Sequence, residues 1–148
     1  MNQPILKVKL HRPEAKAPTV AHPGEDLGYD IYAAETVVLA PHGSAIVPTG
    51  ISVELADETN RPMGALLRDK SSLASKRVIV TAGVIDSGYR GEVRVVMENL
   101  GDTAYSIHAG DKIANLIPYP VLTGDIEVVQ ELAESSRAAG GFGSSGKR

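Results

Sequence analysis

Short runs of alternating apolar and polar residues, separated by turn signals, recur along most of this chain. Residues 6–10 and 51–55 alternate strictly, and residues 93–97 alternate with one slip. Further strand candidates are residues 36–39, 45–47, 65–67, 78–81, 112–117 and 126–130. Gly, Pro, Asp and Asn separate these runs, and helix signals are scarce, the best being a turn or two at residues 71–76. Many short strands at this spacing predict an all-β sandwich or barrel rather than βαβ units.

The composition limits what the core and the chemistry can be made of. A chain of 148 residues suits one domain with its own core. Five tyrosines and one phenylalanine are its only aromatic residues, so we expect a core mostly of Val, Ile, Leu and Ala. The lack of cysteine excludes disulfides, thiolate zinc sites and cysteine nucleophiles. The four histidines do not stand at ligand spacing, so a zinc site is not expected.

Charge and hydropathy limit the partners. The net charge is −3, from 15 basic and 18 acidic residues. Sequence-independent nucleic-acid binding requires a basic excess, so we expect no nucleic-acid partner. No apolar run approaches the roughly 20 residues of a membrane-spanning helix, and the first residues contain no signal-peptide core. We therefore expect no membrane partner and a cytoplasmic location.

The C-terminal end differs from the rest of the chain. Apart from Phe142, residues 140–146 are all glycine or serine, which makes this stretch costly to order. We expect residues 1–134 to form a β-rich domain and residues 135–148 to form a flexible arm. The arm is either a disordered tail without a role, or it closes over a flat anionic ligand. In the second case Phe142 would stack on a base and Arg137 would bind phosphate.

The segment with the densest chemistry is residues 83–101, which predict a strand end, a tight turn and a long strand. Asp86 is explained either as an Asx-turn residue or as a carboxylate beside a binding cavity, where it accepts a proton from an attacking water. Tyr89 is either a half-buried strand aromatic or a flat surface beneath a sugar. The chain has no GxxxxGK[ST] phosphate loop and no GxSxG elbow.

Three polar features lie outside that segment. Residues 68–77 form the main cationic cluster, where Ser71 and Ser72 near a helix start offer groups that suit phosphate oxygens. The alternative for this cluster is a capped, solvated surface turn. Asp30 lies in a short predicted strand between two large side chains, so we expect it to be partly buried or directed at a ligand. Asn115 lies in an apolar strand and therefore needs a hydrogen-bond partner.

Taken in order, five segments of the chain resemble the five motifs of the trimeric dUTP diphosphatases (dUTPases). The segments are residues 28–33 (GYDIYA), 69–74 (DKSSLA), 83–91 (GVIDSGYRG), 110–117 (GDKIANLI) and 137–146 (RAAGGFGSSG). The resemblance spans residues 24–146. It implies a jelly-roll-like β fold, a homotrimer with three shared active sites, and hydrolysis of dUTP to dUMP and pyrophosphate. It also implies Mg²⁺ as the cofactor, held by the substrate phosphates and water.

The resemblance also implies roles for individual residues. Asp86 is the catalytic residue that orients the attacking water, and Tyr89 packs under the deoxyribose, leaving no room for a 2′-hydroxyl. Arg137 meets the γ-phosphate, Phe142 covers the uracil from a neighbouring subunit, and Asp30 holds a magnesium-bound water without binding the metal directly. The hairpin at residues 80–85 reads uracil largely through main-chain groups. The full implied set of substrate-binding residues is Lys70, Ser71, Ser72, Val80, Val84, Ile85, Tyr89, Arg94, Asn115, Arg137, Phe142 and Gly143.

The chain departs from the family pattern at several positions. Lys70 stands where arginine is usual, and lysine lacks the bidentate fork of a guanidinium; Arg68 is a candidate to compensate. Asn115 replaces glutamine, Ala138 replaces glycine, and the uracil hairpin lacks an asparagine often present there.

Two alternative functions remain open at this point. A dCTP deaminase, or its bifunctional form, uses a glutamate after the aspartate turn; Val96 occupies the matching position, with Glu98 nearby. The other alternative is a non-catalytic β module that binds nucleotides.

Overall fold

The computed structural model describes residues 3–146, which form eleven strands and one short helix. Residues 1–2 and 147–148, which belong to the predicted domain and arm, lie outside the described part. The elements in chain order are β1 (Pro4–Leu10), β2 (Tyr29–Tyr32), β3 (Val37–Leu39), β4 (Ser44–Pro48), β5 (Ile51–Asp57), β6 (Pro62–Arg68), α1 (Ser71–Ala74), β7 (Val78–Ala82), β8 (Val84–Ile85), β9 (Arg94–Asn99), β10 (Tyr105–Ile107) and β11 (Lys112–Pro120).

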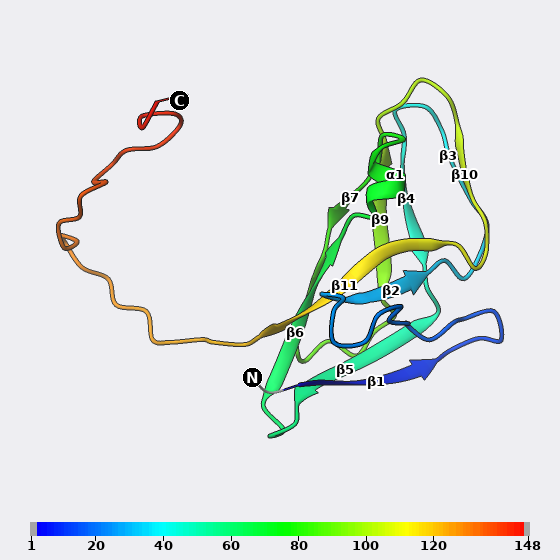
Figure 1. Ribbon diagram of the computed structural model, residues 1–148, viewed down its shortest axis with the longest axis horizontal. Helices are drawn as coiled ribbons and strands as arrows, with labels where there is room; N and C mark the ends of the chain where they lie inside the picture. The colour runs from blue at the N-terminus through cyan, green and yellow to red at the C-terminus, as the bar shows by residue number, and fades with distance from the viewer. Residues whose placement is uncertain (1–2, 147–148) are drawn as a thin grey trace.

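The strands pair antiparallel in three sheets, mostly between segments far apart in sequence. The largest sheet has the order β1-β5-β6-β11-β2, and β8 pairs with β6 outside that path. The second sheet has the order β4-β9-β7, and the third consists of β10 and β3. Figure 1 shows these sheets curled into one body. The prediction of an all-β, jelly-roll-like fold is confirmed.

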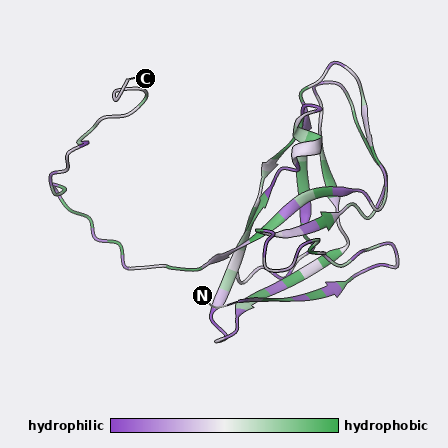
Figure 2. Ribbon diagram, viewed as in Figure 1, coloured by the Kyte–Doolittle hydropathy of each residue, from purple (hydrophilic) through white to green (hydrophobic). Residues whose placement is uncertain are grey.

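One aliphatic core holds the sheets together. Its buried side chains come from all three sheets, among them Ile31, Leu39, Val47, Leu67 and Met97. In Figure 2, the strands of the body carry many apolar residues, which are drawn in green. Tyrosines only pack against the edge of this cluster, so the expectation of a core built from Val, Ile, Leu and Ala is confirmed.

Eight of the nine runs first predicted as strands are present, as is the short strand predicted around Asp30, which is β2, but one run is wrong. Residues 126–130 are irregular in the structure although their sequence alternates. A strand needs a partner for its main-chain hydrogen bonds, and within residues 3–146 no strand pairs with this segment. The strand end predicted before the Asp86 turn is β8, with two residues, whereas the pattern gave no warning of β10, with three.

The predicted helix at residues 71–76 is a single turn, α1. Lys70 occupies its N-cap position in an extended conformation and makes no side-chain capping bond. Leu73 is the buried residue of the turn and anchors it to the core. Among the described residues no helix has the length or apolar character to span a membrane.

After β11 ends at Pro120, the described residues form no further strand or helix and run away from the body (Figure 1). Apolar side chains on this stretch are almost fully exposed, including Leu122, Ile126, Val128 and Leu132. The irregular part therefore begins before the predicted boundary at residue 134, and the division into a domain and an arm stays a prediction.

Candidate active site

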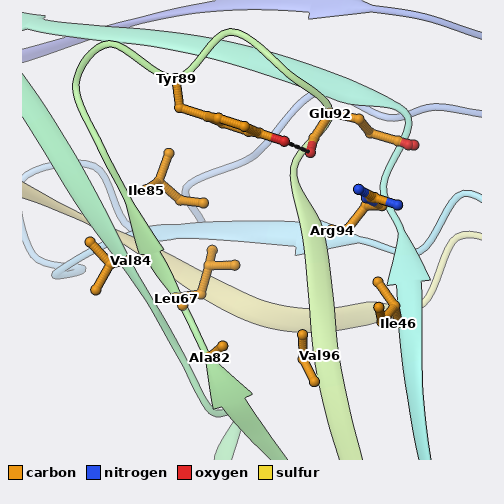
Figure 3. A pocket seen from close by; sticks show the side chains of 10 residues that line it. Ile46, Leu67, Ala82, Val84, Ile85, Tyr89, Glu92, Arg94 and Val96 are labelled. Atoms are coloured by element: carbon orange, nitrogen blue, oxygen red, sulfur yellow. Dashed lines mark hydrogen bonds between the residues drawn. The ribbon is translucent and has the colours of Figure 1, made fainter.

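A first hollow lies between the segment of β7 and β8, which contains the predicted uracil hairpin, and the outer face of β9. Its walls include Ala82, Gly83, Val84 and Ile85 from the hairpin and Arg94 from β9. Figure 3 shows the ring of Tyr89 across one end, with Ile46 and Arg94 on the side opposite Val84. The hollow measures about 270 Å³ and is mostly apolar, which suits a flat ring with few polar edges.

The two strands of this segment do not pair with each other but belong to different sheets, so the predicted hairpin at residues 80–85 is not a paired one. β7 pairs with β9, with a register shift after Val80, whereas β8 pairs with the edge of β6. The bend between them is Gly83, whose carbonyl accepts the N–H of Leu67 at 2.8 Å. A Cβ at Gly83 would stand 2.6 Å from the Cβ of Leu67, so only glycine fits this approach.

Asp86 does not line the hollow itself but stands in the chain between two lining residues, Ile85 and Tyr89. The turn that carries it is closed by the N–H of Tyr89, which donates to the Asp86 carbonyl at 3.0 Å. Within residues 3–146 no hydrogen bond or ion pair engages the Asp86 carboxylate, which is exposed. The turn is therefore held by the main chain, and its carboxylate remains available to a ligand or to water.

Tyr89 is held at the hydroxyl end of its side chain and at its main-chain N–H. Its hydroxyl donates to the carbonyl of Glu92 at 3.0 Å, the dashed line in Figure 3. A Cβ at Gly91 would come within 2.4 Å of that hydroxyl oxygen. Glycine at this position therefore allows the ring to lie flat across the end of the hollow.

A hydrogen-bonded chain behind the turn was not foreseen from the sequence. Ser52 Oγ donates to the Gly91 carbonyl at 2.9 Å and stands 2.6 Å from His11 Nε2. The hydroxyl has one proton, so His11 Nε2 must be the donor in the second bond. Arg12 adds ion pairs to Glu35 and Glu92 at 3.0 and 3.3 Å. Local sequence carried no signal for these contacts, since the strand containing Ser52 is about forty residues from the turn.

A second hollow lies where β2, β11 and the residue before α1 meet. Asp30, Lys70, Lys112 and Asn115 line it, together with His22. Strand pairing brings them together, because Asn115 of β11 stands opposite Asp30 of β2 and opposite the last residue of β6. Three of the five sequence segments singled out above thus converge on one place.

Asp30 is buried beneath two ammonium groups. Its Oδ1 accepts from Lys70 Nζ at 2.5 Å, and its Oδ2 accepts from Lys112 Nζ at 3.0 Å. Burial alone would raise the pKa of Asp30, but the bonds from the two lysines outweigh it and hold the pKa below its ordinary value. The hydrogen bond to Asp30 raises the pKa of Lys112. Asp30 and Lys112 are therefore both charged near neutral pH.

Asn115 has the partner that its position in an apolar strand requires. Its Nδ2 donates to the Asp69 carbonyl at 3.3 Å. The Asp69 carboxylate in turn accepts the N–H of Val80 at 2.6 Å. Val80 is consequently tied to the loop before α1, and it does not line the first hollow.

The remaining predicted site residues lie outside both hollows. Ser71 and Ser72 are exposed on α1, and Arg68 is exposed at the end of β6. Arg137 donates from Nε to the Gly140 carbonyl at 2.7 Å within the C-terminal stretch. Phe142 is fully exposed, and Gly143, beside it, has a φ of 88°.

Within one described chain, most of the predicted residues fall in three places, and Ser71, Ser72 and Val80 lie in none of them. Val84, Ile85, Tyr89 and Arg94 line the first hollow, and Asp86 follows Ile85 in the chain. Lys70, Asn115 and Asp30 line the second hollow. The C-terminal residues reach neither of them (Figure 1).

Comparison with known proteins gives one family. The dUTPase family model matches residues 14–146. The deoxyuridine 5′-triphosphate nucleotidohydrolase of Clostridium tetani is 40% identical, covering 99% of this chain and 100% of that protein. The enzyme of the same name from Solibacter usitatus is 44% identical, covering 96% of each.

Solved structures agree. The dUTPase of Staphylococcus bacteriophage 80alpha with dUpNHpp has a TM-score of 0.85 and 31% identity, covering 96% of this chain and 98% of that one. A variant dUTPase from phage phi11 of S. aureus, solved to reveal the coordination of a structural Mg(II) ion, has a TM-score of 0.77 and 29% identity, covering 86% and 97%. With this fold, these motifs and these relatives, the chain belongs to the dUTPase family.

Proposed function

We infer that the protein hydrolyses dUTP to dUMP and pyrophosphate. The observation that carries this function is the first hollow, an apolar slot followed in the chain by the exposed, unengaged carboxylate of Asp86. The uracil ring occupies the slot between residues 82–85 and β9, and the deoxyribose rests on Tyr89. The names of the two relatives given above state this activity, which supports the proposal.

The chemistry requires little covalent participation by the protein. Cleavage of a phosphoanhydride needs an activated water, in-line geometry and stabilisation of negative charge. Asp86 takes the proton of the attacking water. Lys70, Ser71, Ser72 and Asn115 bind the phosphate chain.

Selectivity follows from the rigid walls of the first hollow. Tyr89 is held by its bond to Glu92 and cannot move aside for a 2′-hydroxyl without losing that bond. Val84 and Ile85 belong to a strand paired with β6, so the hairpin resists widening for the methyl group of thymine. These contacts favour dUTP over UTP and dTTP.

A complete site requires more than one copy of the chain, and we propose a homotrimer. The two hollows use different elements, and Arg137 and Phe142 reach neither hollow of their own chain. Ile126 and Val128 alternate with polar residues and are exposed, as expected for a segment that pairs with a neighbour. In this arrangement residues 1–134 form the domain, and residues 135–148 form an arm that completes a neighbouring site with Arg137, Phe142 and Gly143.

Magnesium is the proposed cofactor. Within residues 3–146 no three His, Asp or Glu side chains gather in a group able to hold a metal. We therefore assign the ion to the triphosphate and water, with Asp30 as a candidate to hold one of its waters. Bound there, Mg²⁺ neutralises charge on the phosphates.

The test is pyrophosphate release from dUTP, UTP, dCTP and dTTP, with and without Mg²⁺. Magnesium-dependent release from dUTP, well above the other three, supports the proposal. Ammonia release from dCTP would support a deaminase instead; in the structure Val96 lines the first hollow and Glu98 does not. Tight dUTP binding without pyrophosphate would support a non-catalytic nucleotide-binding module.

A further inference from the structure

The ring that faces the sugar in the proposed site depends on a short main-chain segment, residues 91–93, for its position. The Tyr89 hydroxyl donates to the Glu92 carbonyl at 3.0 Å. The N–H of the same peptide unit, that of Val93, donates to the Ile51 carbonyl of β5 at 2.8 Å. The acceptor of the tyrosine hydroxyl is therefore held from β5, a strand distant in sequence.

Gly91 is the residue of that segment with the most backbone freedom. A Cβ at this position would come within 2.4 Å of the Tyr89 hydroxyl oxygen, so the flat ring requires glycine here. The same residue that makes room for the ring thus leaves the main chain beside it free to rotate. The Gly91 carbonyl needs a partner from outside the segment to hold the peptide unit that leads into Glu92.

Ser52 of β5 supplies that partner. Its Oγ donates to the Gly91 carbonyl at 2.9 Å, and the residue is only 7% exposed, so water competes poorly for the bond. His11 Nε2 donates to the same oxygen at 2.6 Å, which leaves the single hydroxyl proton directed at Gly91. The His11 N–H donates to the Gly50 carbonyl at 2.8 Å, so the main chain that carries the imidazole is fixed beside β5.

We propose that Ser52 and His11 are positioning residues that set the preference for dUTP over UTP. Ser52 holds the Gly91 peptide unit and with it the acceptor of the Tyr89 hydroxyl, and His11 holds Ser52. Both residues lie outside the five motif segments and neither lines the first hollow, so they act through Tyr89 rather than on the substrate. The proposal rests on the dUTP hydrolysis inferred above.

The first experiment compares kcat/KM for dUTP and for UTP in Ser52→Ala and in Thr36→Ala. Thr36 is a matched control, since its hydroxyl also bonds to the main chain, accepting the Ala109 N–H at 3.3 Å, but it lines neither hollow. Losing the Ser52 bond lets the Tyr89 ring shift, so the ratio of the dUTP value to the UTP value falls roughly three- to tenfold. The kcat for dUTP is largely kept, because Asp86 is untouched. A merely structural role lowers Tm without changing this ratio, and equal ratios in the two variants overturn the proposal.

The second experiment tests whether His11 acts through Ser52. His11→Leu removes the donor and lowers the dUTP/UTP ratio in the wild-type background, but it has no further effect in Ser52→Ala, because the two side chains form one hydrogen-bonded chain. His11→Gln keeps an N–H donor on the side chain and restores most of the ratio. An equal effect of His11→Leu in both backgrounds overturns the route through Ser52.

The proposed function and this inference fail in different ways. If the wild-type protein releases no pyrophosphate from dUTP, the proposed function fails. Isothermal titration of dUTP and of UTP into wild type, Ser52→Ala and Thr36→Ala then tests the positioning role on its own. A weaker preference for dUTP in Ser52→Ala alone supports the role, and the same preference in all three proteins overturns it.

Discussion

Replacing Gly83 with alanine tests whether the hairpin position sets both stability and substrate choice. The new Cβ would stand 2.6 Å from the Cβ of Leu67 and 3.1 Å from its main-chain nitrogen. Carbon atoms pack at about 3.5–4.0 Å, so the two strands must separate by about 1 Å. Leu67 cannot give way, because its Cβ is fixed to the backbone of β6.

The separation also stretches the bond from the Leu67 N–H to the Gly83 carbonyl, now 2.8 Å. Overpacking together with a weakened hydrogen bond costs about 2–3 kcal/mol. For a domain of this size that lowers Tm by roughly 4–12 °C. A wider hairpin also admits thymine more readily, so the preference for dUTP over dTTP falls.

The assay is thermal unfolding at fixed protein concentration, combined with kcat/KM for dUTP and dTTP. Gly88→Ala is the matched control, since a Cβ at Gly88 meets nothing within 4 Å. It stays close to wild type in both measurements. If Gly83→Ala has the same Tm and the same ratio of kcat/KM for dUTP and dTTP as the control, the close approach of Gly83 to Leu67 sets neither stability nor substrate choice.

Four further predictions concern the site and its charges. Asp86→Asn lowers kcat about 10²–10⁴-fold while isothermal titration still detects dUpNHpp binding; a near-normal kcat contradicts its role as base. Tyr89→Ala reduces the kcat/KM ratio of dUTP to UTP, and an unaltered ratio argues against the sugar contact. Deleting residues 137–148 abolishes activity but leaves the β-rich circular dichroism and Tm near wild type, whereas unchanged kinetics would show that the arm is idle. The pKa of Asp30 is lower in the folded state than in the unfolded chain. The ionised Asp30 carboxylate therefore stabilises the fold fully above the pKa of the unfolded chain, and this stabilisation is lost as pH falls through the pKa of the folded state. Denaturant unfolding of Asp30→Asn therefore loses less stability than wild type below about pH 4, and identical pH slopes would refute this linkage.

Local sequence predicted most of the strands because side-chain alternation is a property of neighbouring residues. The turn at Asp86 and the single helical turn before β7 were predicted for the same reason. The strand predicted at residues 126–130 was wrong because alternation alone does not make a strand, and within residues 3–146 no strand pairs with this segment. Very short strands such as β8 exist only because a neighbour offers main-chain groups.

For the candidate site, too, part could be predicted from the sequence and part depended on the tertiary structure. The sequence alone supplied the residue types and the order of the five motifs, and with them the family; the catalytic role of Asp86 and the arm stay predictions. Only the tertiary structure decided that Asp30 lies beneath Lys70 and Lys112, and that His11 and Ser52 brace the Tyr89 turn. Such contacts join strands far apart along the chain, and their distances depend on sheet register, which no local pattern encodes.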